Sequence, residues 1–269
     1  MEKNAKIKRV QPIPSPFQGE YNGEKYQAWN FGILISGISK MASMAKYFRL
    51  MKEHPQLFMN SDGVGTINII TDPEKIKALQ AVKKEEYKKE GKKPVWIDIG
   101  VLSEDPWFWV LRDLVEFPDG KTGGYLRVLN RKSLEGGTNV VMLATLNGKI
   151  VLLRRFSHDK RGWIWEIPHG FGEPGLSADE CARKELEEET GLTPRVMNLV
   201  GRMEGPDGAT AFYYAELMQG ETKPDISEGI SKCELISISD FEQWLFSGKI
   251  TDWFATITYL MCKSKHFIA

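Results

Sequence analysis

Three glutamates in one short charged run could do chemistry together. Glu185, Glu188 and Glu189 stand at i, i+3 and i+4 in the segment ARKELEEETGL, so a helix there would bring their carboxylates onto one face. Like charges at this spacing repel, and an arbitrary run of this kind is more often a solvated helix face. The other interpretation is a hard divalent cation, because Mg²⁺ and Mn²⁺ prefer carboxylate oxygens and commonly bridge to phosphates.

The residues around this run predict the helix that must position the carboxylates. Ser177 and Glu180 have the spacing of a capping box, in which each side chain satisfies a free backbone N–H. Gly191 predicts the end of the helix, because glycine accepts the left-handed conformation found there. We therefore expect a helix over about residues 178–190, preceded by a loop rich in glycine and proline over residues 168–175.

This loop and helix together resemble the Nudix box, the loop-helix-loop signature G-x5-E-x7-R-E-U-x-E-E-x-G-U, where U is a bulky aliphatic residue. The flanking segment EIPHGFGEPG and the tail ISEGISKCELISISDFEQWLFSGKITDWFATITYL are similar to those of ADP-ribose pyrophosphatase-like members. A match over a long gapped pattern, in a strand-loop-helix context, indicates the Nudix hydrolase superfamily. The matching positions are Gly170, Glu185, Leu186, Glu188, Glu189, Gly191 and Leu192.

Two positions depart from the signature. Leu176 stands where the pattern has its first glutamate, and Lys184 stands where it has arginine. Lysine keeps the charge but lacks the planar fork that holds a carboxylate with two bonds. Without an acid at 176, Lys184 could pair with Glu180, four residues earlier, and Asp179 with Arg183 gives a second such pair. The departures leave open a second hypothesis, a catalytically weakened Nudix-fold nucleotide-binding or regulatory module.

The resemblance implies a metal-dependent hydrolase that cleaves a pyrophosphate bond in a nucleoside diphosphate-linked substrate. ADP-ribose or an ADP-sugar is the expected substrate, giving AMP and a sugar phosphate. Cleavage requires charge neutralisation on the phosphate oxygens and an aimed water, which divalent ions can supply. The expected cofactor is Mg²⁺ (or Mn²⁺), and the implied ligands are Glu185, Glu188, Glu189 and the backbone carbonyl of His169.

Four further residues are candidates for the site. Glu228 lies where the relatives place a loop glutamate that binds metal or orients water, although an ordinary surface carboxylate is an equal alternative. It joins Glu185, Glu188 and Glu189 as a predicted catalytic residue. Glu166 precedes the Pro-His-Gly turn, where the relatives carry an acid near the metal. Arg154 and Arg155 end a hairpin strand and could bind phosphates. We group Glu166, Arg154 and Arg155 as substrate-binding candidates.

Length and composition predict two domains. The chain has 269 residues, and single cores usually stop growing beyond about 150 to 250 residues. We expect an α+β Nudix fold over residues 104–269, a mixed β-sheet sandwiched between helices, and a small N-terminal α+β extension of unknown role over residues 1–103. Lys plus Arg and Asp plus Glu both total 36, so no overall field favours nucleic acid or membrane partners. A small nucleotide is the expected partner, and a homodimer stays open.

Local patterns predict several further elements. Prolines and glycines favour an extended arm over residues 1–30, and apolar residues at steps of three or four predict a helix over about residues 38–54. Strands are expected at residues 66–72 and 94–102, with a charged helix beginning at Asp72-Pro73 between them. Hairpins should turn at Asp119-Gly120 and Asn147-Gly148. No signal peptide, membrane span or cysteine ligand spacing is evident, which favours the reducing cytoplasm.

Overall fold

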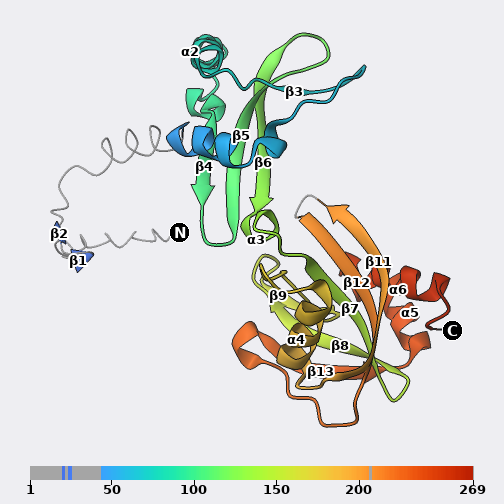
Figure 1. The fold of residues 1–269 in the computed structure, drawn as a ribbon. Coiled ribbons are helices and arrows are strands. Elements are labelled where there is room, and N and C mark those ends of the chain that lie inside the picture. Colours follow the sequence, from blue (N-terminus) through green and yellow to red (C-terminus); the bar gives the residue numbers. More distant parts are fainter. Residues whose placement is uncertain (1–19, 22–23, 26–43, 206–207, 269) are drawn as a thin grey trace, which may run out of the picture.

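The computed structural model describes residues 20–21, 24–25, 44–205 and 208–268. Two separate sheets, one of four strands and one of seven, carry the architecture, and the short helix α3 (Arg131–Leu134) lies where the chain passes between them (Figure 1). The arm expected over residues 1–30 falls almost wholly outside the described residues, apart from the antiparallel pair β1 (Glu20–Tyr21) and β2 (Glu24–Lys25).

The four-stranded sheet is built around one central strand. Strand β5 (Phe108–Glu116) pairs antiparallel with β3 (Asn68–Ile69), β4 (Gly100–Glu104) and β6 (Thr122–Asn130). Its hairpin with β6 turns at Asp119-Gly120 as predicted, and Gly120 takes a positive φ of 76°. The predicted boundary at residue 104 therefore falls inside this sheet, and the chain leaves the sheet only after residue 130.

Two predicted strands of the N-terminal region are shorter than expected. Only Asn68–Ile69 of the 66–72 segment pairs with a neighbour. Residues Pro94–Ile97 form the 3-10 helix η2, and pairing begins at Gly100, because a proline at a first helical position favours a turn over a ladder. The charged helix is confirmed as α2 (Pro73–Lys89), capped by the Asp72 side chain, which accepts from the Lys75 N–H. Residues 44–53 of the predicted 38–54 helix are described and are helical.

The core of this unit contains one buried acid with its partners. Asp113 is almost fully buried on β5 and accepts a hydrogen bond of 2.6 Å from the Tyr47 hydroxyl. The Arg127 Nη2 atom donates to the same carboxylate oxygen at 2.9 Å, and Nε pairs with the other oxygen. A buried charge is costly unless it is paired and hydrogen-bonded, and here both carboxylate oxygens have partners. The surrounding apolar residues include Ile76, Ile97, Leu111 and Leu114.

The seven-stranded sheet is mixed, as the sequence predicts. The order β11-β12-β7-β8-β13 contains one parallel pairing, between β7 and β12, and the short strands β9 and β10 pair with β8 and β7. The β7-β8 hairpin turns at Asn147-Gly148, where both residues take positive φ. The strands are β7 (Asn139–Leu146), β8 (Lys149–Ser157), β9 (Gly162–Glu166), β10 (His169–Gly170), β11 (Pro194–Gly205), β12 (Gly208–Leu217) and β13 (Ile230–Ile236).

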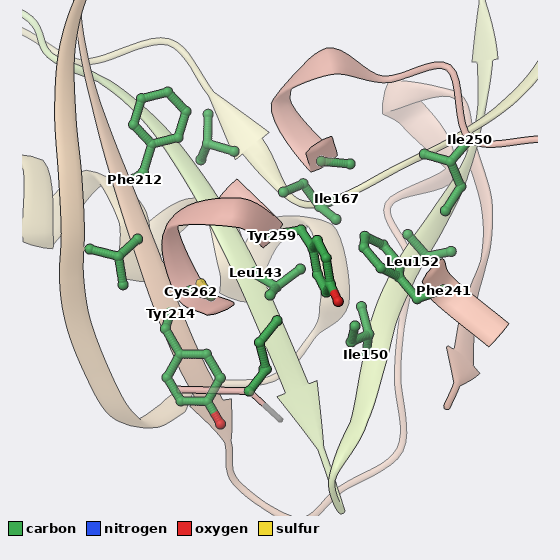
Figure 2. Packing of buried hydrophobic residues seen from close by; sticks show 14 of the residues in the cluster. Leu143, Ile150, Leu152, Ile167, Phe212, Tyr214, Phe241, Ile250, Tyr259 and Cys262 are labelled. Atoms are coloured by element: carbon green, nitrogen blue, oxygen red, sulfur yellow. The ribbon is translucent and has the colours of Figure 1, made fainter. Parts of the chain in front are cut away.

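Helices cover both faces of this sheet, which buries all of β7. Helix α4 (Ala178–Thr190) packs on one face, where Leu186 joins Val140 and Met142 in a buried cluster. Helices α5 (Ile238–Phe246) and α6 (Trp253–Ser264) cover the other face, where Leu143 lies in a second cluster (Figure 2). Alternate residues of β7 thus enter opposite cores, as the two-residue period of a strand requires. Among the described helices, none is long and apolar enough to cross a membrane.

Candidate active site

A cavity of about 520 Å³ opens between the box loop, helix α4 and strand β12. This volume falls in the range of small-molecule sites. Of the predicted site residues, Glu185, Glu188, Glu228, Arg155 and His169 line the cavity. Residues scattered from position 155 to 228 are therefore brought to one place by the sheet and by α4.

The helix that carries the glutamates is built as the sequence predicts. The Ser177 hydroxyl accepts from the Glu180 N–H at 3.2 Å, and the Glu180 carboxylate accepts from the Ser177 N–H at 2.8 Å. The helix ends at Gly191, whose φ of 74° is left-handed. Since Leu186 and Glu189 are both fully buried, this helix turns one side toward the sheet and holds Glu185 at the cavity edge.

The Glu185 carboxyl occupies space that only a glycine at 170 leaves open. A Cβ atom on Gly170 would lie 2.0 Å from the Glu185 carboxyl carbon, so any side chain at 170 would displace it. Burial raises the pKa of Glu185 to about 7, and the neighbouring charges of Glu188 and Glu228 add to the rise. This is a concentration of negative charge that a hard cation would offset.

Glu189 has no exposed surface and uses both carboxylate oxygens. One accepts from the Arg155 Nη2 atom at 3.1 Å, and the other accepts from the His169 backbone N–H at 3.0 Å. Burial raises the pKa of Glu189 well above its usual value, and Arg155 acts in the opposite direction. The His169 ring is held by a 2.9 Å contact from Nδ1 to the Ile167 carbonyl, which can only accept. Nδ1 must therefore carry the proton.

Arg155 is surrounded by carboxylates. Its guanidinium lies 3.0 Å from Glu166, 3.1 Å from Glu189 and 3.0 Å from Glu228. The Nε atom of Arg155 and the Oε1 atom of Glu166 are close but poorly aligned, and neither has a hydrogen-bond partner in the described residues. Arg154 points elsewhere on the same strand: its guanidinium lies 4.9 Å from the Trp163 ring centroid, outside the cavity lining. The predicted arginine pair thus separates into two different environments.

The predicted pair between Lys184 and Glu180 is wrong. Glu180 is engaged by the helix cap, and Lys184 instead pairs with Glu173 of the box loop and lies 3.8 Å from Glu188. The second predicted pair, Asp179 with Arg183, is confirmed at 2.7 Å. The loop brings Glu173 within reach because it folds back over the helix, and spacing along the helix carries no signal of that contact.

The donors at the cavity fit a hard divalent ion. Carboxylate and carbonyl oxygens are the ligands that Mg²⁺ and Mn²⁺ prefer. The Glu185 carboxyl lies in the space left by Gly170, and its raised pKa indicates negative charge that the surrounding residues do not neutralise. Within the described residues, no three His, Cys, Asp or Glu side chains already stand in metal-binding geometry. Instead, the Arg155 guanidinium lies among Glu166, Glu189 and Glu228.

The aromatic part of the cavity lining was not predicted from the sequence. Trp107, Phe171, Trp253 and Phe254 also border the cavity, as does Lys132. Isolated tryptophans carry no motif, and core packing is the commoner role for each one. Their exposure in the structure is the signal that separates them from core residues, since Trp107 is 49% exposed and Trp253 is 56% exposed.

Segments of this chain are similar in sequence to known pyrophosphohydrolases and pyrophosphatases. Over 66 residues the chain is 36% identical to an RNA pyrophosphohydrolase of Erythrobacter litoralis, covering 24% of this chain and 40% of that protein. It is 38% identical over 61 residues to an ADP-ribose pyrophosphatase of Methanocaldococcus jannaschii, covering 23% and 36%. It is 33% identical over 99 residues to an ADP-ribose pyrophosphatase of Bacillus subtilis, covering 37% and 46%. The chain thus spans less than half the length of each of these relatives.

A solved structure and a family model are also similar to this chain. The crystal structure of an ADP compounds hydrolase has a TM-score of 0.51 and 16% sequence identity, covering 61% of this chain and 89% of that one, which shows a shared fold. Residues 136–254 match the model of the NUDIX domain. The box helix α4 with its glutamates lies within this matched segment.

Proposed function

We propose that this protein hydrolyses a phosphoric anhydride bond in a nucleoside diphosphate-linked substrate, with a divalent metal ion. The observation that carries the proposal is the row of carboxylates from α4 at the cavity, with Glu185 seated in the space left by Gly170. A solvated helix face, the alternative for such a run, would leave its acids in water. Here Glu189 is fully buried and the pKa of Glu185 is raised by burial, which argues against that alternative.

The residues that would hold the ion are those the box supplies. Glu185, Glu188, Glu189 and the backbone carbonyl of His169 offer oxygen ligands suited to Mg²⁺ (or Mn²⁺). A bound divalent ion would supply charge neutralisation at the phosphate oxygens. The chain itself would place the substrate and hold the attacking water. We assign the second task to Glu228, on the 3-10 helix η3 (Ile226–Glu228), because it borders the cavity and is fixed by Arg155 at 3.0 Å.

ADP-ribose or an ADP-sugar is the substrate we propose. Two of the relatives are ADP-ribose pyrophosphatases, and the solved neighbour is an ADP compounds hydrolase. In this reaction a water oxygen bonds to one phosphorus while the bond from the bridging oxygen to that phosphorus breaks. AMP and a sugar phosphate leave, and the two water protons are shared between the products and solvent.

A substrate panel tests the proposal. Purified protein is incubated with Mg²⁺ or Mn²⁺ and ADP-ribose, NAD, a dinucleoside polyphosphate or capped RNA, and monophosphate products are measured. We expect ADP-ribose to be cleaved fastest, with loss of turnover in Glu189→Gln. Glu187→Gln is the matched control, because Glu187 lies on the same helix but is exposed and outside the cavity lining. If no compound is turned over above a metal-free control, the proposal is wrong.

One observation favours the second hypothesis, a nucleotide-binding module with weakened catalysis. Arg155 is bound to Glu189 and Glu228, so a metal ion must compete with a resident guanidinium. Calorimetric titration with ADP-ribose in the absence of metal separates the two hypotheses. Tight binding without hydrolysis would favour the module, whereas hydrolysis that is abolished by Glu189→Gln would reject it.

A further inference from the structure

Two residues that border the cavity lie outside the NUDIX match. The matched segment begins at residue 136, whereas Trp107 belongs to the turn between β4 and β5 and Lys132 belongs to α3. The N-terminal sheet therefore contributes part of the cavity wall. No chemical role was expected for this region from its sequence, so this contact is the first indication of what it does.

The turn holds Trp107 in a fixed position. The Asp105 carboxylate accepts from the Trp107 N–H and from the Phe108 N–H, both at 2.7 Å, and the Trp107 carbonyl accepts from the Arg131 N–H at 2.8 Å. The Arg131 side chain also donates to the Asp105 carbonyl at 2.6 Å. These bonds leave the backbone little freedom, yet the indole remains 49% exposed. The hydrogen-bonded turn thus presents a large apolar ring at the cavity instead of burying it in the core.

An aromatic patch extends from this ring into the box loop. Phe171 stacks against Trp107 with ring centroids 6.1 Å apart and an interplanar angle of 28°, and it contacts Phe108 edge-on at 5.8 Å. The Lys132 ammonium lies 5.7 Å from the Trp107 ring centroid. Within the described residues, Lys132 has no carboxylate at salt-bridge distance, unlike Arg155, which has three. The patch therefore combines a stacking surface with an available positive charge.

The segment that links the two sheets packs closely against the box loop and the start of β12. A Cβ on Gly137 would lie 2.4 Å from the Gly172 carbonyl oxygen, and a Cβ on Gly172 would lie 2.1 Å from the Thr138 nitrogen. A Cβ on Gly208 would lie 2.4 Å from the Ser133 side chain. Such close approach requires glycine at positions 137, 172 and 208, because a side chain there would collide with the facing segment. The α3 segment, which carries Lys132, therefore lies close against the start of β12.

We propose that Trp107 forms the nucleobase subsite of this cavity, with Lys132 beside it. The proposal rests on the proposed function, since it names where the part of the nucleotide that is not cleaved would bind. Every base has a π-face, so stacking on an indole tolerates different bases. The subsite would therefore distinguish a nucleotide from a simple sugar phosphate, but it would discriminate little between one base and another. The N-terminal sheet then serves as the part of the protein that recognises the substrate.

Paired ligands and paired variants test the subsite. AMP and ribose 5-phosphate share a phosphorylated ribose and differ in the base, and neither contains an anhydride bond, so binding is measured without hydrolysis. Affinities are determined by calorimetry and by tryptophan fluorescence for wild-type, Trp107→Ala, Trp107→Phe and Trp96→Ala proteins. Trp96 is the control, because it lies in the same unit at 54% exposure but outside the cavity lining. Circular dichroism verifies that each variant is folded.

We expect Trp107→Ala to weaken AMP binding about 5- to 150-fold, the range of base stacking on an aromatic side chain, and to leave ribose 5-phosphate unchanged. Trp107→Phe should keep most of the affinity, and Trp96→Ala should equal the wild type. Equal AMP affinities for the Trp107→Ala and Trp96→Ala proteins would overturn the subsite, as would a wild-type protein that binds AMP no better than ribose 5-phosphate. If AMP binds through Trp107 but no substrate is cleaved, the subsite stands and the proposed hydrolysis fails.

Discussion

The four-stranded and the seven-stranded sheet each carry a cluster of acid and arginine, and the two clusters differ in the number of carboxylates per arginine. In the N-terminal unit, Asp113 is a single carboxylate whose oxygens are both satisfied by Tyr47 and Arg127. In the segment that matches the NUDIX model, one arginine, Arg155, faces three carboxylates. A balanced cluster serves the fold, because every buried charge has its partner. An excess of acid at a cavity is costly to the fold and is the arrangement that a cation-binding site requires.

The largest expected effect separates catalysis from stability. Replacing Glu189 with glutamine should lower turnover of ADP-ribose about 100-fold or more, since a contribution of about 3 kcal/mol to the transition state corresponds to that factor. The free energy of unfolding should change much less, because the amide removes a buried charge but leaves one of the Arg155 and His169 donors without its acceptor. Initial rates and urea unfolding of the same preparation measure both quantities. A variant that is fully active but less stable would place Glu189 with the structural cluster instead.

The converse change in the N-terminal cluster should affect stability. Asp113→Ala leaves the Arg127 guanidinium and the Tyr47 hydroxyl without their acceptor. Breaking a buried ion pair costs about 3 to 5 kcal/mol, and we expect about 2 to 4 here because the Arg127 side chain is 25% exposed. The midpoint of urea unfolding measures the loss. Glu116→Ala is the control, since Glu116 is an exposed acid on the same strand. Equal stability of the two variants would contradict the comparison.

Removing the arginine from the unbalanced cluster should strengthen metal binding. Arg155→Gln takes away the guanidinium that lies against Glu189 and Glu228, so these acids become available to a cation. We expect Mn²⁺ to bind about tenfold more tightly, corresponding to about 1.4 kcal/mol. Calorimetric titration of the metal-free protein measures this without reference to activity. Arg154→Gln is the matched control, because Arg154 lies over Trp163 instead. Weaker Mn²⁺ binding in Arg155→Gln would show that the arginine supports the metal site.

The smallest expected effect concerns the substituted position of the box. Lys184 pairs with Glu173, so this contact replaces the acid-arginine pair that Leu176 and Lys184 lack. Both side chains are more than two-fifths exposed, and exposed ion pairs contribute about 0.2 to 1 kcal/mol. A double-mutant cycle with Glu173→Gln and Lys184→Met should give a coupling in that range for turnover. If the effects of the two substitutions on turnover are strictly additive, the contact does not position the loop. Restoring the signature pair with Leu176→Glu and Lys184→Arg should then not raise turnover.

Features governed by neighbouring residues could be predicted from the sequence. The box helix has the predicted bounds and caps, because the capping box, the terminal glycine and the glutamate spacing all act within one or two turns. Both hairpins form at the predicted dipeptides for the same reason, since Asn147, Gly148 and Gly120 take the positive φ that their turns require. The spacing of Glu185, Glu188 and Glu189 likewise predicted a shared helix, and in the structure Glu185 and Glu188 border the cavity while Glu189 is fully buried.

Features that depend on pairing across the chain were decided by the tertiary structure. The predicted boundary at residue 104 falls inside a sheet because β5 pairs with β3, β4 and β6, and no local pattern states which strands will share a sheet. Arg155 lies among three carboxylates because β8, β9, α4 and η3 converge there. The sequence by itself determined that α4 forms with its glutamates on one face, because the interactions responsible span only a few residues. Only the fold could decide that Trp107, far from the box in sequence, lies at the same cavity, because the position of the β4-β5 turn depends on how the chain packs on either side of α3.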